Sequence, residues 1–361
     1  MKMKPTSPKW KDNLIQIKPY TPGEQIKVPD LIKLNTNENP FPPSHRVQSV
    51  IRTFCSKDLP LYPAPDVFPL KKAIAEYSNA PIESVFVGNG SDEVLAFAFR
   101  AFFNSTQPVL FPDITYSFYP VWCHFFGIPY EEIALDSEFR IRIYEYNRPN
   151  GGVVIANPNA PTGIGEGPEF VEYLIKSNQD SVVIVDEAYV DFGGYSAIPL
   201  VGKYDNLLVT RTFSKARALA GMRLGYCIGS SALIAAMHAV KDSFNSYTVS
   251  SLAAAAGVAS LSDETYFRAQ VERIMRLRYI YMKKLRALGF VVLESVTNFL
   301  FVSHEKIPAR ALYEFLKSKN ILVRYFDKPR VDQFLRITIG TKESMDKLIE
   351  GILEFTEGRQ A

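Results

Sequence analysis

Short, continuous apolar runs recur through the first two thirds of the chain, and polar or glycine-containing segments follow them. The runs cover residues 85–87, 109–111, 152–156, 182–185, 207–209 and 224–228. Strands that are apolar throughout, rather than alternately apolar and polar, are typical of sheets buried on both faces. Helical stretches separate several of the runs, including one from about residue 68 to 77 and one that ends near residue 103. The pattern therefore predicts an α/β fold with a mainly parallel central sheet covered by helices.

A different pattern begins after about residue 245. Its predicted helices cover residues 250–261, 266–288 and 309–319, and its predicted strands cover residues 290–293, 299–302, 321–323 and 334–338. In the longest helix, apolar residues such as Ile274, Leu277 and Tyr281 recur at helical spacing on one face. These elements predict a smaller α+β C-terminal domain. The predicted organisation is an N-terminal arm over residues 1–44, a large domain over 45–245 and a small domain over 246–361.

The predicted arm contains a segment that is not expected to form a helix or a strand. In residues 34–44, Pro40, Pro42 and Pro43 remove backbone donors and fix φ. The polar side chains before these prolines, at residues 35, 37, 38 and 39, are expected to line a site or to cap turns. On the sequence alone, turn capping is the favoured role of these side chains.

Composition narrows the class of protein. Hydrophobic residues make up 47% and charged residues 22% of 361, as in ordinary soluble globular proteins. The 41 basic and 38 acidic residues give a net charge of +3, which is too balanced to indicate nucleic-acid binding. No apolar stretch is long enough to span a bilayer, and the N-terminus lacks the apolar segment of a secretory signal. Three widely spaced cysteines predict reduced thiols and a cytoplasmic location, and the four histidines do not cluster as metal ligands.

Polar side chains follow the predicted strands of the large domain where each strand ends. They are Ser91, Tyr116, Asn157, Asn159, Asp186, Tyr189 and Lys215. Because the carboxyl ends of parallel strands meet at one edge of a sheet, these side chains are expected to converge there. The segment Gly88–Glu93 has the arrangement of a strand, a glycine turn and a helix start, which is suited to binding an anion. Taken singly, a well-capped helix, with Ser91 or Asp92 as its N-cap, is the favoured interpretation of this segment.

Lys215 lies in an unusual position, between a strand end and a glycine-containing turn. A lysine held in a pocket can act as a neutral amine and attack a carbonyl to form a Schiff base, while Ser214 and Arg223 nearby are suited to binding a phosphate. These two features together are the requirements of pyridoxal phosphate, which also needs an acid beside its ring nitrogen. A surface lysine is the alternative, because most lysines are solvated.

Several motifs in a fixed order resemble those of a known family. They are Gly88-Asn-Gly-Ser-Asp92, Asn157-Pro-Asn-Ala-Pro-Thr-Gly163, Asp186-Glu-Ala-Tyr189, Thr212-Phe-Ser-Lys215 and Arg223-Leu-Gly-Tyr226. With them the chain resembles the fold-type I pyridoxal-phosphate aminotransferases, and more closely the histidinol-phosphate aminotransferase family. Residues 34–40, Tyr62-Pro63, residues 322–324 and residues 335–340 extend this resemblance from about residue 30 to the C-terminus.

The resemblance implies a role for each motif residue. Lys215 would bind the cofactor aldehyde as a Schiff base and then move the substrate proton as base and acid. Asp186 would pair with the protonated ring nitrogen, and Tyr189 would donate to the ring hydroxyl oxygen O3′. Tyr116 would stack on the ring. The phosphate would be held by Gly90, Ser91, Thr212, Ser214 and Arg223. Tyr62 would reach that phosphate from a neighbouring subunit, which implies a homodimer.

One position departs from the family pattern. The family usually has an asparagine immediately before Pro-Thr-Gly, where it donates to O3′, but this chain has Ala160. Either the loop shifts and Asn159 supplies the contact, or Tyr189 serves O3′ alone. Asn159 is therefore included among the expected cofactor contacts.

Three residues are expected to bind the substrate. Two arginines, Arg324 and Arg336, can clamp one anionic group by forked hydrogen bonds. The resemblance implies that both contact the phosphate of histidinol phosphate and that Arg336 also binds a carboxylate of glutamate, while Asn39 is the third expected contact. The predicted reaction exchanges nitrogen between L-histidinol phosphate with 2-oxoglutarate and imidazole-acetol phosphate with L-glutamate. The alternatives are an aromatic-amino-acid aminotransferase, a threonine-phosphate decarboxylase and a non-enzymatic sensor that keeps the cofactor fold.

Overall fold

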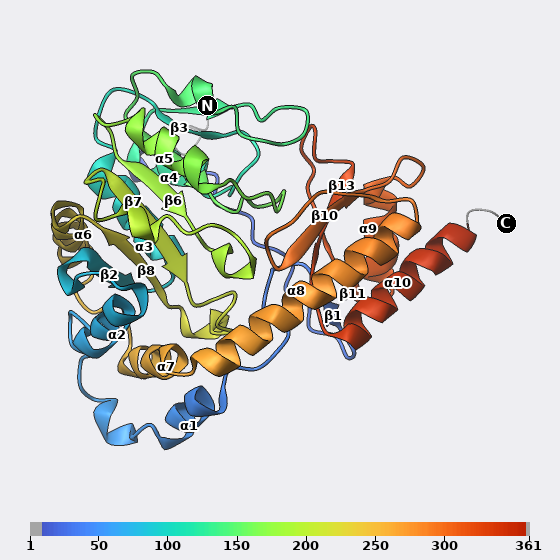
Figure 1. The fold of residues 1–361 in the computed structure, drawn as a ribbon, viewed down its shortest axis with the longest axis horizontal. Coiled ribbons are helices and arrows are strands. Elements are labelled where there is room, and N and C mark those ends of the chain that lie inside the picture. Colours follow the sequence, from blue (N-terminus) through green and yellow to red (C-terminus); the bar gives the residue numbers. More distant parts are fainter. Residues whose placement is uncertain (1–8, 359–361) are drawn as a thin grey trace, which may run out of the picture.

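The computed structural model describes residues 9–358, and its largest feature is a seven-stranded sheet (Figure 1). The strand order is β2-β8-β7-β6-β5-β3-β4. The strands are β2 (Val85–Gly88), β3 (Val109–Pro112), β4 (Tyr130–Ile133), β5 (Gly152–Ala156), β6 (Val183–Asp186), β7 (Leu207–Thr212) and β8 (Gly225–Gly229). Neighbours from β7 to β4 run parallel, whereas β8 is antiparallel to both β2 and β7. The predicted mainly parallel sheet of an α/β fold is confirmed.

Helices cover both faces of this sheet, which explains why its strands are apolar throughout. One face packs against α1 (His45–Thr53), α2 (Phe68–Ser78), α5 (Pro168–Lys176) and α7 (Ser251–Leu261). The other face packs against α3 (Ser91–Phe102), α4 (Tyr119–Phe126) and α6 (Ser231–Phe244). In β5, Val153 and Ile155 face the first layer and Val154 faces the second, so successive side chains enter different cores.

Strand β4 was absent from the predicted strands. Its sequence is Tyr-Glu-Glu-Ile, and it pairs only with β3 at the edge of the sheet. Glu131 and Glu132 are exposed there, so the continuous apolar run that revealed the other strands is missing. Charged side chains on an edge strand also discourage pairing with a second sheet.

The small domain has a second, four-stranded antiparallel sheet in the order β12-β13-β10-β9. Its elements are α8 (Glu264–Ala287), β9 (Val291–Val292), β10 (Phe299–Ser303), α9 (Ala309–Ser318), β11 (Ile321–Leu322), β12 (Arg324–Tyr325), β13 (Phe334–Thr338) and α10 (Lys342–Glu357). Figure 1 shows α8 running from the large domain to the small one, with α9 and α10 beside it. Short 3-10 helices cover residues 9–13, 56–58, 82–84, 143–146, 190–192, 198–200 and 220–222.

The packing changes from one core to the other between α7 and α8. Ala253, Ala256 and Leu261 of α7 belong to the core under the large sheet, whereas Ile274 of α8 belongs to the core of the small domain. The predicted boundary near residue 245 lies before α7 and so differs from this packing. Because α7 is rich in alanine, it has no distinct polar face, and its sequence does not reveal which of the two domains it packs against.

The N-terminal arm joins the small domain by a short strand. β1 (Ile32–Lys33) pairs in parallel with β11, and Leu34 is buried in the small-domain core. The Leu34 backbone N–H donates to the Leu322 carbonyl at 2.8 Å, and the Leu34 carbonyl accepts from the Thr338 backbone N–H at 2.9 Å. Residues 35–39 are thereby held between the two domains. Residues 1–8 of the predicted arm and 359–361 of the predicted C-terminal domain lie outside the described residues.

Candidate active site

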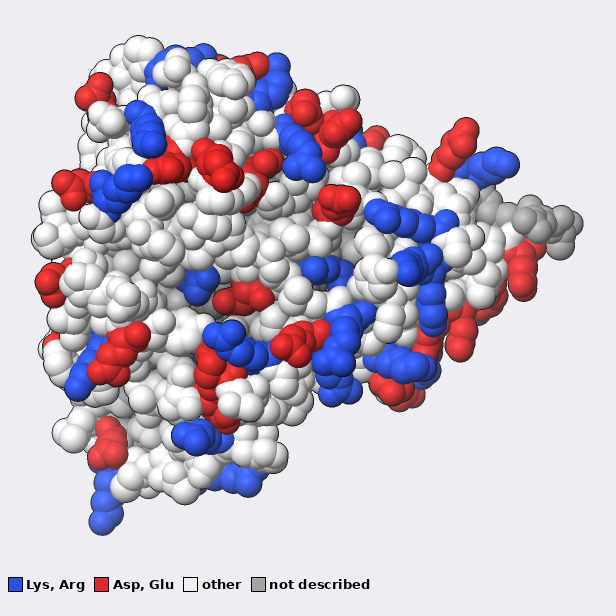
Figure 2. Space-filling view, in the orientation of Figure 1, with Lys and Arg blue, Asp and Glu red and all other residues white. Residues whose placement is uncertain are grey.

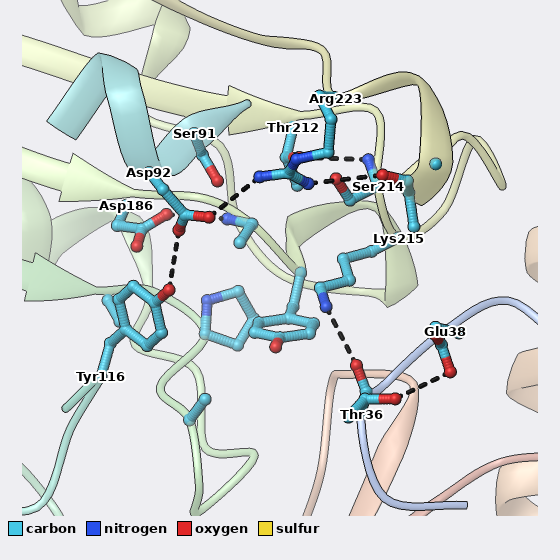
Figure 3. A pocket seen from close by; sticks show the side chains of 17 residues that line it. Thr36, Glu38, Ser91, Asp92, Tyr116, Asp186, Thr212, Ser214, Lys215 and Arg223 are labelled. Carbon is cyan, nitrogen blue, oxygen red and sulfur yellow. Dashed lines mark hydrogen bonds and ion pairs between the residues drawn. The ribbon is translucent and has the colours of Figure 1, made fainter. Parts of the chain in front are cut away.

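A cavity of about 390 Å³ lies at the carboxyl ends of the large-domain strands, where polar side chains were expected to converge. Of the residues expected there, it is lined by Ser91, Tyr116, Asp186, Tyr189, Thr212, Ser214, Lys215 and Arg223. These residues lie at the ends of β6 and β7, at the start of α3, and in the segments that follow β3, β6 and β7. Figure 3 shows hydroxyls and Arg223 gathered at one end of the cavity, with Lys215 pointing into it.

Lys215 is held by the turn that follows β7 and is partly buried. Backbone hydrogen bonds from Phe213 to Leu224 and from Leu219 to Phe213, both 3.0 Å, close this turn. The ammonium Nζ donates to the carbonyl oxygen of Thr36 at 3.2 Å and lies 5.8 Å from the centre of the Tyr189 ring. Within residues 9–358 the Thr36 carbonyl is the one hydrogen-bond partner of Nζ, so this lysine is suited to covalent chemistry rather than to a structural ion pair.

One end of the cavity is built to bind an anion. Ser91 begins α3, whose first backbone N–H groups have no acceptor within the helix and carry its positive dipole end. Thr212, Ser214 and Arg223 face the same space (Figure 3). A Cβ atom at Gly90 would lie 2.6 Å from the Arg223 guanidinium, and one at Gly225 would lie 2.3 Å from the Ser91 nitrogen. Only glycine permits this close approach, so the residues present fit a phosphate.

Asp186 is the last residue of β6 and lines the same cavity. It is 5% exposed and accepts hydrogen bonds from the hydroxyls of Tyr119 (3.0 Å) and Thr210 (3.3 Å) and from the backbone of Ala188 (3.2 Å). Burial raises the pKa of Asp186 to about 6, and the three donors oppose part of that shift. A buried carboxylate that lacks a cationic partner is suited to hold a protonated ring nitrogen opposite a phosphate.

Two tyrosines, Tyr116 and Tyr189, also line the cavity. The Tyr116 hydroxyl donates to the Asp92 carboxylate at 2.7 Å, and the Arg223 guanidinium donates to the other oxygen of that carboxylate at 3.0 Å. Burial and the nearby Asp92 raise the pKa of Tyr116 well above its ordinary value, so its phenol stays protonated. The Tyr189 hydroxyl accepts from the Asn37 side chain at 2.9 Å.

The cavity opens into a second lobe of about 490 Å³ that contains Arg324 and Arg336. Lys215 and Tyr189 line both lobes. The two arginines lie directly opposite each other on β12 and β13. Arg336 donates to the Asn35 carbonyl at 3.0 Å, and its Nε has no hydrogen-bond partner in residues 9–358. Burial and the nearby Arg324 lower the pKa of Arg336. Two close cations bound only to carbonyls can bind an anionic substrate group.

The structure does not bring every expected residue into this cleft. Asn159 is 4% exposed, and its side chain bonds to Thr115, Thr162 and the Ile114 carbonyl at 2.8, 3.1 and 2.9 Å. Ala160, rather than Asn159, lines both lobes. The expected contact from Asn159 is therefore corrected, because these three hydrogen bonds occupy its carboxamide within the protein and it is not among the residues that line the cavity.

Asn39 and Tyr62 also lie outside the cleft of this chain. The Asn39 side chain donates to the carbonyls of Lys215 and Ala216 at 3.3 and 3.1 Å. Asn39 therefore supports the backbone of the turn that contains Lys215, and it does not line the cleft. Its expected contact with substrate is corrected. Tyr62 is 81% exposed on a loop before α2, where it stacks on Tyr247 with ring centres 4.7 Å apart. A role of Tyr62 in a neighbouring subunit stays a prediction.

Several residues of the cleft were not among the expected cofactor or substrate contacts. They are Tyr20, Thr36, Asn37, Glu38, Asp92 and Phe326, together with the buried Tyr119 that donates to Asp186. Asn37 and Glu38 were considered as lining residues, but turn capping was the favoured interpretation. Asp92 follows Ser91 directly in the glycine turn, so that motif was the available signal. Tyr20 stands in a segment without secondary-structure patterning, and no local signal identifies it.

None of the helices within residues 9–358 has the length and hydrophobicity that a membrane span requires. The same residues contain no group of three or more His, Cys, Asp or Glu side chains arranged to hold a metal ion. Figure 2 shows acidic and basic side chains interspersed over the visible face, without a large region of one sign.

Known proteins resemble this chain over nearly its whole length. The family described as aminotransferase class I and II matches residues 29–352. The histidinol-phosphate aminotransferase of Lactococcus lactis subsp. cremoris is 49% identical over 351 residues, which cover 97% of this chain and 99% of the relative. That of Chromohalobacter salexigens is 51% identical over 343 residues, covering 95% and 97%. The solved histidinol-phosphate aminotransferase of Sinorhizobium meliloti, in complex with pyridoxal-5'-phosphate, is 25% identical with a TM-score of 0.80, covering 89% of this chain and 91% of that one.

Proposed function

This chain belongs to the class I and II aminotransferase family, and from that premise we propose that it is a histidinol-phosphate aminotransferase. It is a pyridoxal-phosphate-dependent transaminase. The proposed reaction exchanges the amino group reversibly between L-histidinol phosphate with 2-oxoglutarate and imidazole-acetol phosphate with L-glutamate. The relatives at 49% and 51% identity carry that name.

The observation that carries the substrate proposal is the second lobe of the cleft. Arg324 and Arg336 lie opposite each other there, and neither has a carboxylate partner within 4.0 Å among residues 9–358. A phosphate monoester has enough charge and enough acceptor oxygens for both guanidinium groups. Lys215 lines the same lobe, so an anion bound by the arginines keeps the rest of the substrate near the lysine.

The roles of the cofactor residues are part of the proposal. When bound, pyridoxal phosphate supplies an electron-accepting ring. Asp186 holds the proton of the ring nitrogen, and Tyr189 donates to the ring hydroxyl oxygen. Tyr116 packs against the ring face, while Gly90, Ser91, Thr212, Ser214 and Arg223 hold the phosphate. Lys215 takes the proton from the substrate carbon and returns it as acid.

The experiment that tests the substrate is a single-turnover measurement with the purified holoenzyme. We expect L-histidinol phosphate to change the visible absorption of the bound cofactor at least about a hundredfold more efficiently, per unit of concentration, than L-phenylalanine. Phenylalanine offers these arginines only its carboxylate, which has less charge and fewer acceptor oxygens than a phosphate monoester. Equal efficiency would support an aromatic-amino-acid aminotransferase, and release of carbon dioxide from threonine phosphate would support the decarboxylase.

We further propose that the enzyme is a homodimer in which Tyr62 of each subunit contacts the cofactor phosphate of the other. The exposure of Tyr62 and of Leu59, Leu61 and Phe68 beside it supports a covered surface at this loop. Mixing Tyr62→Ala subunits with Lys215→Ala subunits tests the arrangement, because a mixed dimer has one site with both residues intact. We expect recovery of roughly a quarter of wild-type activity after random exchange. No recovery of activity would indicate that Tyr62 acts in the active site of its own subunit.

The proposed location is the cytoplasm. Cys55, Cys123 and Cys227 all have free thiols, as expected where the environment is reducing. Fractionation of cells that express the tagged chain tests this location, and recovery with a membrane or periplasmic marker would contradict it.

A further inference from the structure

The departure at Ala160 raises the question of what supports the cofactor's ring hydroxyl oxygen in this chain. Ala160 lines both lobes of the cavity, and its side chain has no group that can donate a hydrogen bond. Asn159 beside it is bonded to Thr115, Thr162 and Ile114, so it does not replace the missing donor. Of the cofactor residues proposed above, Tyr189 alone remains to donate to that oxygen.

The hydroxyl of Tyr189 has one hydrogen-bond partner among residues 9–358, the carboxamide of Asn37, whose Nδ2 lies 2.9 Å from it. Asn37 is 1% exposed and comes from the N-terminal arm, 152 residues away in sequence. Its φ of +57° is in the left-handed region, which asparagine tolerates better than most residues. The backbone conformation of the arm at Asn37 therefore directs the Asn37 carboxamide toward Tyr189.

The orientation of that carboxamide is determined by Thr338. The Thr338 hydroxyl accepts a hydrogen bond from the Asn37 backbone N–H at 3.0 Å, so its single proton is available for the Asn37 oxygen Oδ1, also at 3.0 Å. With Oδ1 accepting from Thr338, Nδ2 must face Tyr189. Asn298 holds the Asn37 carbonyl from the other side at 2.9 Å. The amide end that contacts Tyr189 is thus a donor.

A phenol oxygen that accepts from Asn37 keeps its own proton for another acceptor. No hydrogen-bond acceptor for that proton is found among residues 9–358, and Tyr189 faces the cavity beside Lys215. A hydroxyl that accepts one hydrogen bond also becomes a stronger donor in the next one. The Asn37 contact therefore directs the phenol proton into the cavity and strengthens it as a donor.

We propose that Asn37 is a positioning residue for the cofactor, which orients the Tyr189 hydroxyl as the donor to the ring hydroxyl oxygen and so offsets the absence of a carboxamide at residue 160. This inference rests on the proposed cofactor role of Tyr189 but not on the identity of the substrate. It also links the small domain to the cofactor, because Thr338 is two residues from Arg336 on the same face of β13.

The test uses the holoenzyme without substrate and measures the pKa at which the visible absorption of the bound cofactor changes with pH. A hydrogen bond donated to the ring oxygen stabilises the negative charge on that oxygen. The oxygen then binds less strongly the proton that it shares with the lysine nitrogen, so losing the donor raises this pKa. Asn37→Gly removes the side chain while keeping a residue that accepts φ of +57°. We expect Asn37→Gly to raise the pKa by about 0.5 to 1 unit.

A double-mutant comparison separates positioning from a general disturbance. Tyr189→Phe should raise the same pKa by at least as much, and Asn37→Gly should add nothing in the Tyr189→Phe background, because Asn37 acts through the hydroxyl that is then missing. The matched control is Asn79→Gly, since Asn79 has φ of +49° at the end of α2 and lies outside the cleft. The control should leave the pKa unchanged.

Asn37→Asp is the second variant in case the glycine variant folds poorly. An aspartate keeps the acceptor for Thr338 but presents an acceptor to Tyr189, so the phenol proton turns away from the cavity and the pKa rises. An unchanged pKa in both variants, or additive shifts in the double mutant, would overturn the inference. Because no substrate is present, these outcomes are independent of whether histidinol phosphate is the substrate, which the single-turnover experiment decides.

Discussion

The two ends of the cleft both present arginine, but they balance its charge differently. At the cofactor end, Arg223 donates to the Asp92 carboxylate at 3.0 Å and lies beside the start of α3. At the substrate end, Arg324 and Arg336 have only backbone carbonyls as acceptors among residues 9–358. The cofactor end therefore combines several moderate donors, whereas the substrate end leaves two positive charges for an incoming anion.

This difference separates the expected consequences of substitution. A change at the cofactor end should alter the cofactor's absorption and every reaction that depends on it. A change at the substrate end should alter the KM for an anionic substrate while the spectrum of the holoenzyme stays the same. The following predictions test this separation from the largest expected effect to the smallest.

Lys215→Ala should have the largest effect, because the lysine lines both ends of the cleft. We expect turnover to fall by at least about 10⁴-fold with every amino donor, since both the covalent attachment and the proton-transfer group are lost. Steady-state kinetics and the visible spectrum of the cofactor-loaded protein measure this. Lys203→Ala, at an exposed lysine paired with Glu172, is the control. Retained turnover in Lys215→Ala would falsify the central assignment.

Asp186→Asn should lower turnover by about 10²- to 10³-fold or more, because the ring nitrogen loses its anionic partner. It should also change the pH dependence of stability in the cofactor-free protein. Burial raises the pKa of Asp186 from 3.8 to about 6, so its favourable contribution is complete below pH 3.8 and is lost as the pH rises through about 6. At pH 8 the asparagine variant should be more stable by about 1 to 3 kcal/mol.

Denaturant unfolding of the cofactor-free proteins at pH 5 and pH 8 measures that difference. Asp180→Asn, at an exposed position, is the control for replacing a carboxylate. If the stability difference between Asp186→Asn and wild type is the same at both pH values, then Asp186 does not carry the buried charge inferred for the cofactor end.

Arg324→Gln should raise the KM for L-histidinol phosphate by about 10- to 100-fold, because one of the two charged donors to its phosphate is removed. The KM for L-glutamate should change less, and the holoenzyme spectrum should not change. Arg310→Gln, at an exposed arginine paired with Glu314, is the control. Equal increases in KM for both substrates would break the proposed division between the two ends.

Ala160→Asn should have the smallest effect. A carboxamide at this position adds a second donor near the ring hydroxyl oxygen, so the pKa of the cofactor's absorption change should fall by about 0.5 unit. The shift should be larger when Asn37 is replaced by glycine, because the remaining donor is then weaker. A pH titration of the visible spectrum in both backgrounds measures this, and a rise in the pKa would contradict the prediction.

Much of the cofactor end could be predicted because its residues follow strands closely in sequence. Ser91 follows β2 by three residues, and Lys215 follows β7 by three. Parallel strands bring such positions together without further information. The edge strand β4 escaped prediction because Glu131 and Glu132 interrupt its apolar pattern. Asn159 and Asn39 were assigned to ligands because an asparagine in a loop does not reveal which backbone or side-chain groups it bonds.

The sequence by itself determined the α/β class, the succession of buried strands along the chain and the lysine just after β7. These features depend on local periodicity and on residues next to one another. The tertiary structure decided which arm residues enter the cleft. Asn37 meets Tyr189 across 152 positions and Thr338 across 301, and these pairings depend on two domains closing around the arm. Such contacts have no local pattern, because the two partners of each pair belong to segments that are far apart in the sequence.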